Sequence, residues 1–334
     1  MSSLTGMGIY AEGAILTFGM QFLGFAVAAT LQTEVFYDIL GGINFMALAF
    51  LSVATTAVDG ADGSGVVGTA NSAIFLGLFV ISRGWLLFFL AWRAHDRKGD
   101  SRFDGVRDVP SKFFVYWMVQ AVWVYCISLP ILVAVAAEIA VSDGSSPTNP
   151  LVSTGFLVGM AVSVVVEIHS DVIKARWVGR GRPGGFCTEG LWKISRHPNY
   201  AGEILTWVFA ACYAALATGR LRWTDALVAA VSPLFTVQIL LNTPGTGVWH
   251  AEGKNLKRYY EHADPDIARN YEEYRRTTPP VFPVPFVPYE RIPPPIQRML
   301  FFEWERYEYK PSSSSSKGSS TSQDDRGVTG DLSM

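Results

Sequence analysis

The sequence is poor in charged residues. Asp, Glu, Lys and Arg make up 17% of its 334 residues, whereas 49% are hydrophobic. An ordinary soluble domain carries about a quarter charged residues, so this deficit excludes that class and favours a membrane protein. The charges are also segregated, because the apolar segments hold very few of them. No basic stripe lies on a soluble domain, which excludes nucleic acid as a partner.

Cysteine and histidine are also scarce. Cys126, Cys187 and Cys212 are odd in number and scattered, so they imply no disulfide framework. The five histidines are dispersed without the spacing of a zinc site, and we predict no metal centre. Ser195 lies close to His197 in sequence but without a triad signature, which disfavours a serine nucleophile.

Long apolar runs are the main feature that the sequence does contain. A helix that spans a membrane needs about 20 largely apolar residues. Runs of this kind lie at 9–31, 39–58, 72–92, 113–141, 151–170, 201–218 and 224–243. The last two are short or interrupted by glycine. We therefore predict an all-α, polytopic transmembrane bundle with about seven spans and a range of six to eight.

Basic residues are unevenly distributed over the predicted loops. The segments 93–112 and 171–200 each carry several Lys and Arg residues, whereas 59–71 and 142–150 carry none. Because cytoplasmic loops hold the excess of positive charge, seven spans place both basic loops and the C-terminus in the cytosol. Two arginines in the turn before the last run fall on the side opposite to the cytosol, against the charge rule. A re-entrant hairpin, which does not cross the membrane, is therefore the alternative for the last two runs.

The sequence becomes polar after the last apolar run. Residues 250–278 are rich in tyrosine and charge, which is typical of a pair of surface helices. Residues 279–295 hold eight prolines and favour an extended strap. Residues 296–310 are aromatic and charged, and we predict an interfacial segment there. The serine-rich residues 311–334 are predicted to be disordered.

The densest group of polar side chains lies between two apolar runs, at 190–203. Its members are Trp192, Lys193, Arg196, His197, Asn199, Tyr200 and Glu203. Folding alone explains such a group poorly, so we predict a bound polar ligand. A helical pattern begins near Pro198, which the first turn of a helix tolerates. A helix start preceded by Arg196 and His197 is suited to bind an anion, and a basic loop on lipid headgroups is the alternative.

Further polar residues lie inside or beside the apolar runs. Arg83 is near the middle of one, where an arginine should face the bundle interior or a wet cavity, with snorkelling as the alternative. Glu167, Asp171 and Lys174 share one helix face, where ion pairing at the interface is an equally good explanation. Gln120 has a helix-packing hydrogen bond as its alternative role.

The segment 179–184 reads Gly-Arg-Gly-Arg-Pro-Gly and formally matches the dinucleotide-binding pattern G-x-G-x-x-G. That pattern must follow a strand and open a helix. Here it follows an apolar membrane run and contains Pro183, so we reject a dinucleotide fold. We interpret the segment as a flexible basic loop that is able to contact phosphate.

The segment Gly190-Leu-Trp…Ser-Arg-His-Pro-Asn-Tyr-Ala-Gly-Glu203 resembles the signature of the steroid 5-alpha-reductase-like membrane proteins. The resemblance continues upstream in Gln120-Ala-Val-Trp123 and Ser128-Leu-Pro130, and downstream in Tyr271-Glu-Glu-Tyr274. Isoprenylcysteine carboxyl methyltransferases share the Arg-His-Pro-x-Tyr core. A membrane methyltransferase that uses S-adenosylmethionine is therefore the alternative.

The resemblance implies an NADPH-dependent reductase of a C=C bond in a lipid or sterol-like substrate, in the endoplasmic reticulum membrane. Residues 71–295 would form the reductase-like domain, after N-terminal spans in 1–70. The implied cofactor contacts are Asp171, Lys174, Trp192, Arg196, His197, Asn199, Tyr200, Glu252 and Tyr274. Tyr200 or Glu203 would donate the proton, and we assign Arg83 and Gln120 to the substrate pocket.

One departure from the family pattern concerns phosphate binding. Relatives tend to carry an arginine at the position of Val178, four residues after the matched lysine. Arg176 or Arg180 would have to take its place in this chain.

Overall fold

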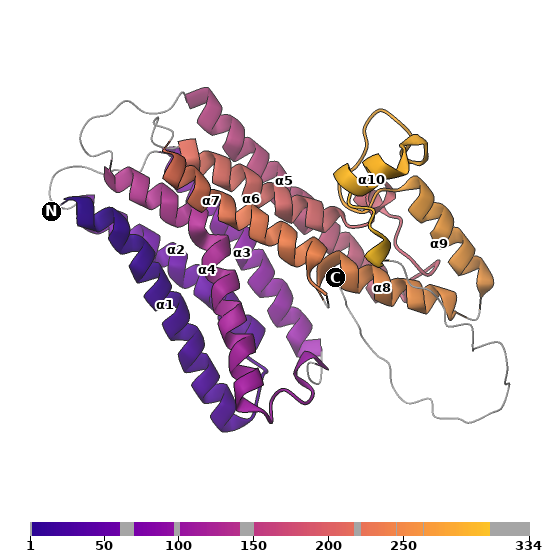
Figure 1. The fold of residues 1–334 in the computed structure, drawn as a ribbon, viewed down its shortest axis with the longest axis horizontal. Helices are drawn as coiled ribbons and strands as arrows, with labels where there is room; N and C mark the ends of the chain where they lie inside the picture. The colour runs from indigo at the N-terminus through magenta and orange to yellow at the C-terminus, as the bar shows by residue number, and fades with distance from the viewer. Residues whose placement is uncertain are drawn as a thin grey trace. The chain divides into compact units, whose positions relative to one another are not determined.

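The computed structural model describes residues 2–60, 70–96, 101–140, 150–216, 222–244, 246–262 and 264–307. These residues contain no strand, and the chain is 81% helix, which confirms the all-α prediction. The long helices are α1 (Ser2–Leu31), α2 (Tyr37–Gly60), α3 (Ala70–Asp96), α4 (Pro110–Ala140), α5 (Pro150–Gly179), α6 (Pro198–Leu216) and α7 (Trp223–Val237) (Figure 1).

Six segments of the described residues are long and apolar enough to cross a membrane. They are Gly8–Leu31, Tyr37–Thr56, Ala70–Trp92, Pro110–Glu138, Leu151–Gly179 and Trp223–Tyr260. Six lies within the predicted range and is one fewer than the favoured seven. The run predicted at 201–218 corresponds to α6, which is not among the six. Asn199, Tyr200 and Glu203 make the first two turns of this helix polar.

The chain forms two compact units, which we treat separately. The bundle unit comprises Met1–Val165 and Glu203–Thr236, and the C-terminal unit comprises Val166–Gly202 and Val237–Met334. Both α5 and α6 therefore contribute residues to each unit.

Apolar helices make up the bundle unit. Helix α1 packs along α4, and α2 packs against both α3 and α4 (Figure 1). One close approach is at Gly41 on α2, where a Cβ atom would lie 2.1 Å from Gln120 Nε2 on α4. Large apolar side chains also point outward, such as Phe50 at 74% exposure and Leu227 at 70%. Outward apolar side chains of this kind suit contact with lipid.

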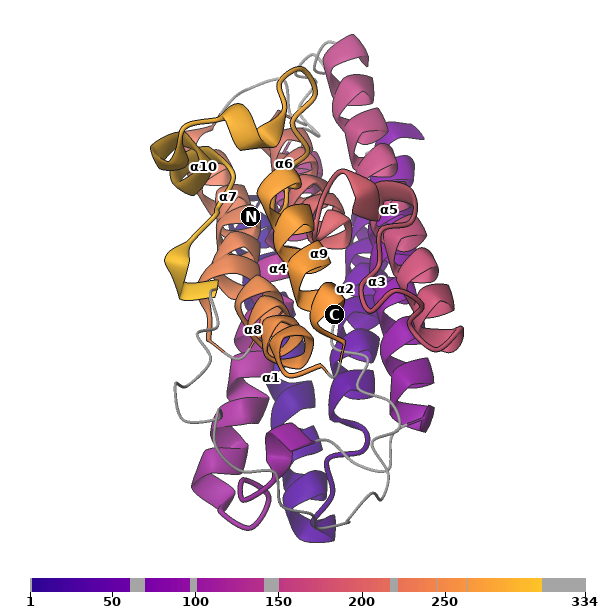
Figure 2. The same ribbon diagram turned by 90° about the vertical axis from the view of Figure 1, so that its right-hand side faces the viewer.

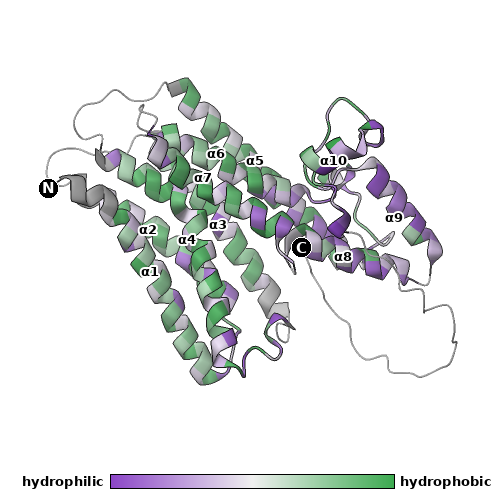
Figure 3. Cartoon of the chain, in the orientation of Figure 1, coloured by the Kyte–Doolittle hydropathy of each residue, from purple (hydrophilic) through white to green (hydrophobic). Residues whose placement is uncertain are grey.

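Helices α8 (Gly247–Tyr260) and α9 (Pro265–Thr277) of the C-terminal unit lie side by side (Figure 2). They are mostly hydrophilic, in contrast to α1–α7 (Figure 3). The predicted pair of helices is therefore present, and its place at the surface stays a prediction. Helix α8 follows a π-helix, η3 (Gln238–Asn242).

The proline-rich segment after α9 contains little regular structure. It holds only a short 3-10 turn, η4 (Tyr289–Arg291), before α10 (Pro294–Leu300). The predicted extended strap is therefore wrong at its end, because α10 begins with Pro294. Proline is tolerated there since the first N–H groups of a helix have no partner within it. A last 3-10 turn, η5 (Glu305–Tyr307), ends the described chain.

Candidate functional site

The start of the polar segment is fixed against α5. Trp192 Nε1 donates a hydrogen bond to Ser170 O at 3.0 Å. Gly190 has φ +54°, and a Cβ atom there would lie 2.4 Å from Ile173 Cδ1. Glycine is the residue that reaches this conformation without steric cost, so the turn that leads to Trp192 requires it.

The next residues are fixed against the proline-rich segment. Ser195 Oγ donates to Val281 O at 2.6 Å, and the backbone N–H of Arg196 donates to Pro279 O at 3.0 Å. Together with the contacts to α5, these bonds hold Arg196 and its neighbours at the beginning of α6. The side chains that follow are therefore positioned by two separate parts of the C-terminal unit.

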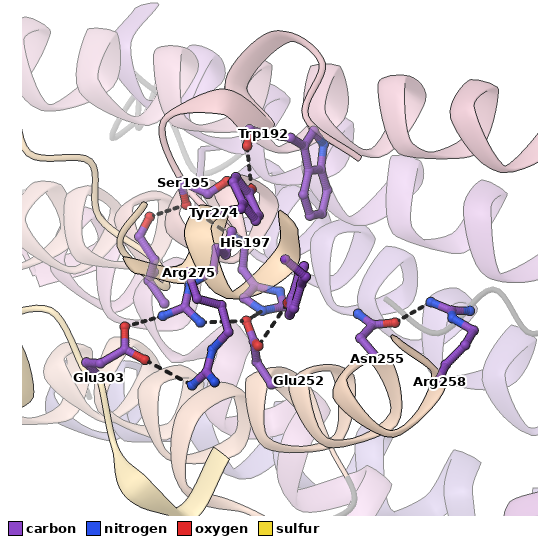
Figure 4. A network of polar contacts seen from close by, with 12 residues as sticks. Trp192, Ser195, His197, Glu252, Asn255, Arg258, Tyr274, Arg275 and Glu303 are labelled. Carbon is purple, nitrogen blue, oxygen red and sulfur yellow. Dashed lines mark hydrogen bonds and ion pairs between the residues drawn. The ribbon is translucent and has the colours of Figure 1, made fainter. Parts of the chain in front are cut away.

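Glu252 on α8 is the centre of a buried polar network (Figure 4). Its Oε1 lies 3.0 Å from His197 Nε2 and 3.3 Å from Arg196 Nη1. Its Oε2 accepts a hydrogen bond from Tyr271 OH at 3.0 Å. Because a carboxylate only accepts, His197 Nε2 carries the proton in this contact. The side chain of Glu252 is 0% exposed and that of Arg196 is 1% exposed, so solvent screens the pair little.

Arg196 has a second carboxylate partner, Glu303, which lies between α10 and η5. Arg196 Nη2 pairs with Glu303 Oε2, and this oxygen also accepts from Tyr289 OH at 2.9 Å. Arg275 Nη2 lies 3.6 Å from the other carboxylate oxygen. Within the described part of the chain, Arg196 Nε has no hydrogen-bond partner. The guanidinium thus lies between two carboxylates, with its Nε–H not used by either of them.

Burial and charge together set the protonation of this network. Burial alone would lower the pKa of Arg196, but the carboxylates of Glu252 and Glu303 outweigh it and raise that pKa. Burial lowers the pKa of His197 in spite of its hydrogen bond to Glu252, so the imidazole is neutral at pH 7. Burial, reinforced by the charge of Glu252, raises the pKa of Tyr271 well above its usual range. Tyr271 is therefore a hydrogen-bond donor at all working pH values.

A small cavity adjoins the network. Its volume is about 20 Å³, which is room for about one water molecule. Its walls are mostly aromatic or polar and consist of Lys174, Phe186, Cys187, Trp192, Arg196, His197, Asn199, Ala251, Asn255, Tyr259, Tyr271 and Tyr274. Any ligand larger than water therefore requires these walls to move apart.

One lysine of the cavity wall, Lys174, is close to two further cations. The Lys174 ammonium lies 4.3 Å from the ring centre of Trp192 and 4.7 Å from that of Trp177. Arg182 and Arg258 are close enough for their positive charges to act on Lys174. Like charges repel, so this gathering is unfavourable by itself. Such clusters are typical of sites that bind an anion.

The two arginines that act on Lys174 belong to different elements. Arg182 belongs to the glycine-rich loop after α5 and has φ +58°, a conformation that is uncommon for a residue with a side chain. Arg258 on α8 donates to Asn255 Oδ1 at 2.5 Å (Figure 4) and lies over the ring of Tyr259 at 5.3 Å. The basic loop predicted to contact phosphate thus contributes one of the three cations.

The structure gathers the residues predicted to bind the cofactor in the C-terminal unit. Those in the cavity wall are Lys174, Trp192, Arg196, His197, Asn199 and Tyr274. Glu252 and Tyr200 both contact His197, and the ring of Tyr200 stacks on the imidazole with centres 5.2 Å apart. Asp171 is buried on α5, one turn before Lys174. Cofactor binding by this set stays a prediction.

Glu203, Arg83 and Gln120 belong instead to the bundle unit. Arg83 Nη1 lies 3.3 Å from Glu203 Oε1, and its guanidinium lies 4.7 Å from the ring centre of Trp207. Gln120 Nε2 donates to Tyr37 O at 2.8 Å, which is the packing role considered for it above. The substrate-pocket role of Arg83 and Gln120 stays a prediction.

Several residues of the site were not assigned from the sequence. They are Arg182, Phe186, Cys187, Asn255, Arg258, Tyr259, Tyr271, Tyr289, Arg275 and Glu303. Half of them lie on α8 and α9, where their spacing from Glu252 could have indicated them. No motif surrounds Glu303, so nothing in the sequence indicated its pairing with Arg196.

Arg176 and Arg180 were the expected substitutes for the missing arginine at Val178. Arg176 is exposed, and Arg180 pairs with Glu189 at 2.5 Å with both side chains about half exposed. Arg182, in the same loop as Arg180, is close enough for its charge to act on Lys174. Which of these arginines contacts a phosphate stays a prediction.

Residues 24–278 match the family described as "Protein of unknown function (DUF1295)", which is more than half of the chain. The chain belongs to the DUF1295 family. This family includes steroid 5-alpha-reductase-like membrane proteins, so the resemblance is confirmed at this level, and the specific reductase branch stays a prediction. The DUF1295 match contains every residue assigned to the cofactor and ends before Tyr289 and Glu303.

One curated relative also matches this DUF1295 protein. A probable O-methyltransferase, ustE of Ustilaginoidea virens, is 36% identical to it over 70 residues. The match covers 20% of the present chain and 24% of ustE, so the chain spans about a quarter of the length of this relative. No solved structure matches the chain.

Proposed function

We propose that this DUF1295 protein is a membrane-embedded, NADPH-dependent reductase of a C=C bond in a lipid or sterol-like substrate. An aromatic cavity lined by Lys174 and Arg196, with Arg182 and Arg258 close enough for their charges to act on Lys174, is the observation that carries this proposal. NADPH combines phosphates with flat ring systems. Cationic side chains suit the phosphates, and aromatic walls suit the rings.

The remaining site residues have complementary roles in this proposal. Arg196 offers its unpartnered Nε–H and a buried charge to an anionic group. Asn199 offers an amide at the start of α6, where the helix N-terminus favours negative charge. Trp192 and Tyr274 form one wall, tied together by the hydrogen bond from Tyr274 OH to Trp192 O at 2.5 Å. Glu252 holds Arg196 and His197 in position through its contacts with both side chains.

Reduction of a C=C bond needs a hydride on one carbon and a proton on its neighbour. NADPH supplies the hydride when it is bound. We assign the proton to Tyr200, because a phenol carries a proton at neutral pH and its ring stacks on His197 with only 6° between the planes. Glu203 stays the second candidate donor, and its carboxylate pairs with Arg83 in the bundle unit.

The second candidate function is an S-adenosylmethionine-dependent methyltransferase of the isoprenylcysteine carboxyl type. The name of ustE, a probable O-methyltransferase, favours it. Aromatic walls also suit a sulfonium ion, which binds to ring faces. The cluster of Lys174, Arg182 and Arg258 weighs against it, because like charge repels a cationic methyl donor.

Thermal stability of the detergent-purified protein tests the two functions against each other. NADPH, NADP+, S-adenosylmethionine and S-adenosylhomocysteine are added separately. A ligand at about 100 times its Kd stabilises the folded state by about 2.7 kcal/mol. We expect a higher Tm with NADPH and NADP+. A rise with S-adenosylmethionine and its product alone would rule out the reductase.

A further inference from the structure

Glu303 is a contact of the candidate site that lies outside the DUF1295 match. Its carboxylate pairs with Arg196, which also lines the cavity and pairs with Glu252. Glu303 is shared by two arginines, because Arg275 Nη2 lies 3.6 Å from its other carboxylate oxygen. When the contact between Arg196 and Glu303 breaks, Arg196 therefore keeps the carboxylate of Glu252 and Glu303 keeps the guanidinium of Arg275.

The two carboxylates are held differently. Glu252 is 0% exposed and also bonds to His197 and Tyr271. Glu303 is 22% exposed and lies on a non-helical stretch between α10 and η5. A buried carboxylate loses its hydration almost entirely, whereas a partly exposed one regains it readily. Glu303 is thus the partner that leaves Arg196 at the lower free-energy cost.

The chain just after Glu303 is tied down independently of Arg196. Arg306 Nη1 donates to Asn242 Oδ1 at 2.8 Å, and Tyr307 OH donates to Leu241 O at 2.7 Å. A carboxylate on a tethered segment remains near its partner at high effective concentration. When Glu303 leaves Arg196, these contacts keep it ready to return.

We propose that Glu303 is an internal carboxylate that occupies Arg196 in the ligand-free protein and that an anionic group of the cofactor displaces. This inference rests on the proposed function, since it takes the incoming group to be a phosphate of NADPH. The unpartnered Nε–H of Arg196 gives that group a first donor. Guanidinium groups pair with phosphate in a bidentate fork, which is available once Glu303 has moved away.

The small cavity agrees with this displacement. A space of about 20 Å³ holds no nucleotide, so binding must coincide with movement of a wall or of a neighbouring segment. Removing the charge of Glu303 should therefore favour binding, because the incoming anion no longer competes with it. If Glu303 only stabilised Arg196, removing its charge would instead weaken NADPH binding.

Calorimetric titration of the full-length protein in detergent tests the proposal with NADPH, S-adenosylmethionine and inorganic pyrophosphate. Glu303→Gln removes the charge and keeps the shape and the acceptor for Tyr289. We expect it to bind NADPH and pyrophosphate about tenfold more tightly than the wild type. Glu305→Gln is the matched control, because Glu305 is 71% exposed and pairs only with Arg298 at the surface. It should bind like the wild type.

Tyr289→Phe provides a second variant if Glu303→Gln folds poorly. It removes the hydrogen bond that holds Glu303 at 2.9 Å and leaves the charge in place. We expect a smaller gain in NADPH affinity, in the same direction. Hydrogen exchange should also show faster exchange of the amides of 301–307 in the wild type when NADPH is added.

The outcomes separate this inference from the proposed function. If the wild type binds NADPH and Glu303→Gln binds it equally or more weakly, the displacement is overturned and the reductase proposal stands. If the wild type binds S-adenosylmethionine and not NADPH, the reductase proposal fails. In that case, the proposal that an anion displaces Glu303 stands only if Glu303→Gln binds pyrophosphate about tenfold more tightly than the wild type does. Absence of binding by both proteins to all three probes overturns both.

Discussion

Two arginines, one in each unit, are buried with different kinds of partner. Arg83 in the bundle unit pairs with Glu203 at 3.3 Å, and the ring of Trp207 lies 4.7 Å from its guanidinium. Arg196 in the C-terminal unit lies between two carboxylates, of which Glu252 is the fully buried one. Only Arg196 also lines the cavity described above.

We interpret Arg196 as the cation that meets a ligand. An aromatic face and one carboxylate offset the desolvation of Arg83 within an apolar bundle. Arg196 has two carboxylate partners and a place in the cavity wall. The predictions below test this contrast, beginning with the largest expected effect.

Glu252→Gln should have the largest effect. It leaves Arg196 and His197 buried without their shared carboxylate, and breaking a buried ion pair costs about 3–5 kcal/mol. We expect a large drop in the Tm of the detergent-purified protein and loss of the NADPH-dependent rise in Tm. Glu261→Gln, on the exposed end of α8, should leave both unchanged. A Tm for Glu252→Gln close to that of the wild type would contradict the central role of this carboxylate.

The pair in the bundle unit should give a smaller coupling. Arg83→Leu, Glu203→Leu and the double variant form a double-mutant cycle, and residues in direct contact couple by about 0.5–3 kcal/mol. We expect each single variant to unfold more easily and the double variant to recover part of the loss. NADPH binding should respond to this pair less than to Arg196. Strict additivity would show that the pair contributes nothing to stability.

Arg258→Gln tests the cation cluster. Removing one charge-assisted contact to a phosphate should weaken NADPH binding about tenfold. Lys257→Gln is the matched control, because the neighbouring lysine is exposed. The Kd values come from calorimetric titration. Equal affinities of Arg258→Gln and the wild type would remove the cluster from the phosphate site.

A pH effect on stability should follow from His197, and it is the smallest of the four. The folded protein lowers the pKa of His197 by burial, so the unfolded chain binds a proton that the folded chain does not. Stability is then complete above about pH 6.5 and decreases as the pH falls below that value, by at most about 1.4 kcal/mol per pH unit. In Tm measurements across this range, His197→Gln should show a flatter profile than the exposed-site variant His262→Gln. Parallel profiles would contradict the assignment.

The sequence allowed much of the C-terminal site to be predicted, because its residues are dense and lie near one helix start. Trp192, Arg196, His197 and Asn199 lie within a few positions of one another, and the structure places all four in one cavity wall. The signal that allowed this prediction was the polarity of these residues next to long apolar runs. The same polarity also explains why α6 does not qualify as a membrane span, although the run at 201–218 was predicted as one.

Other features depend on tertiary contacts that no local pattern encodes. Glu303 meets Arg196 only because the proline-rich segment returns across the C-terminal unit. Arg182 lies close enough to act on Lys174 in a loop that turns through a positive φ after α5. Helix α10 was missed because consecutive prolines usually exclude a helix, whereas Pro294 lies where its missing N–H has no consequence.

Titration of the purified protein with NADPH, in the wild type and in Arg196→Gln, tests the central claim most directly. Arg269→Gln is the control, because this arginine is exposed at 74% and pairs only along its own helix. We predict that the wild type binds NADPH with a Kd of about 1 µM and that Arg196→Gln binds it at least about tenfold more weakly. Equal NADPH affinity of Arg196→Gln and the wild type, or binding of S-adenosylmethionine in place of NADPH, would contradict the account.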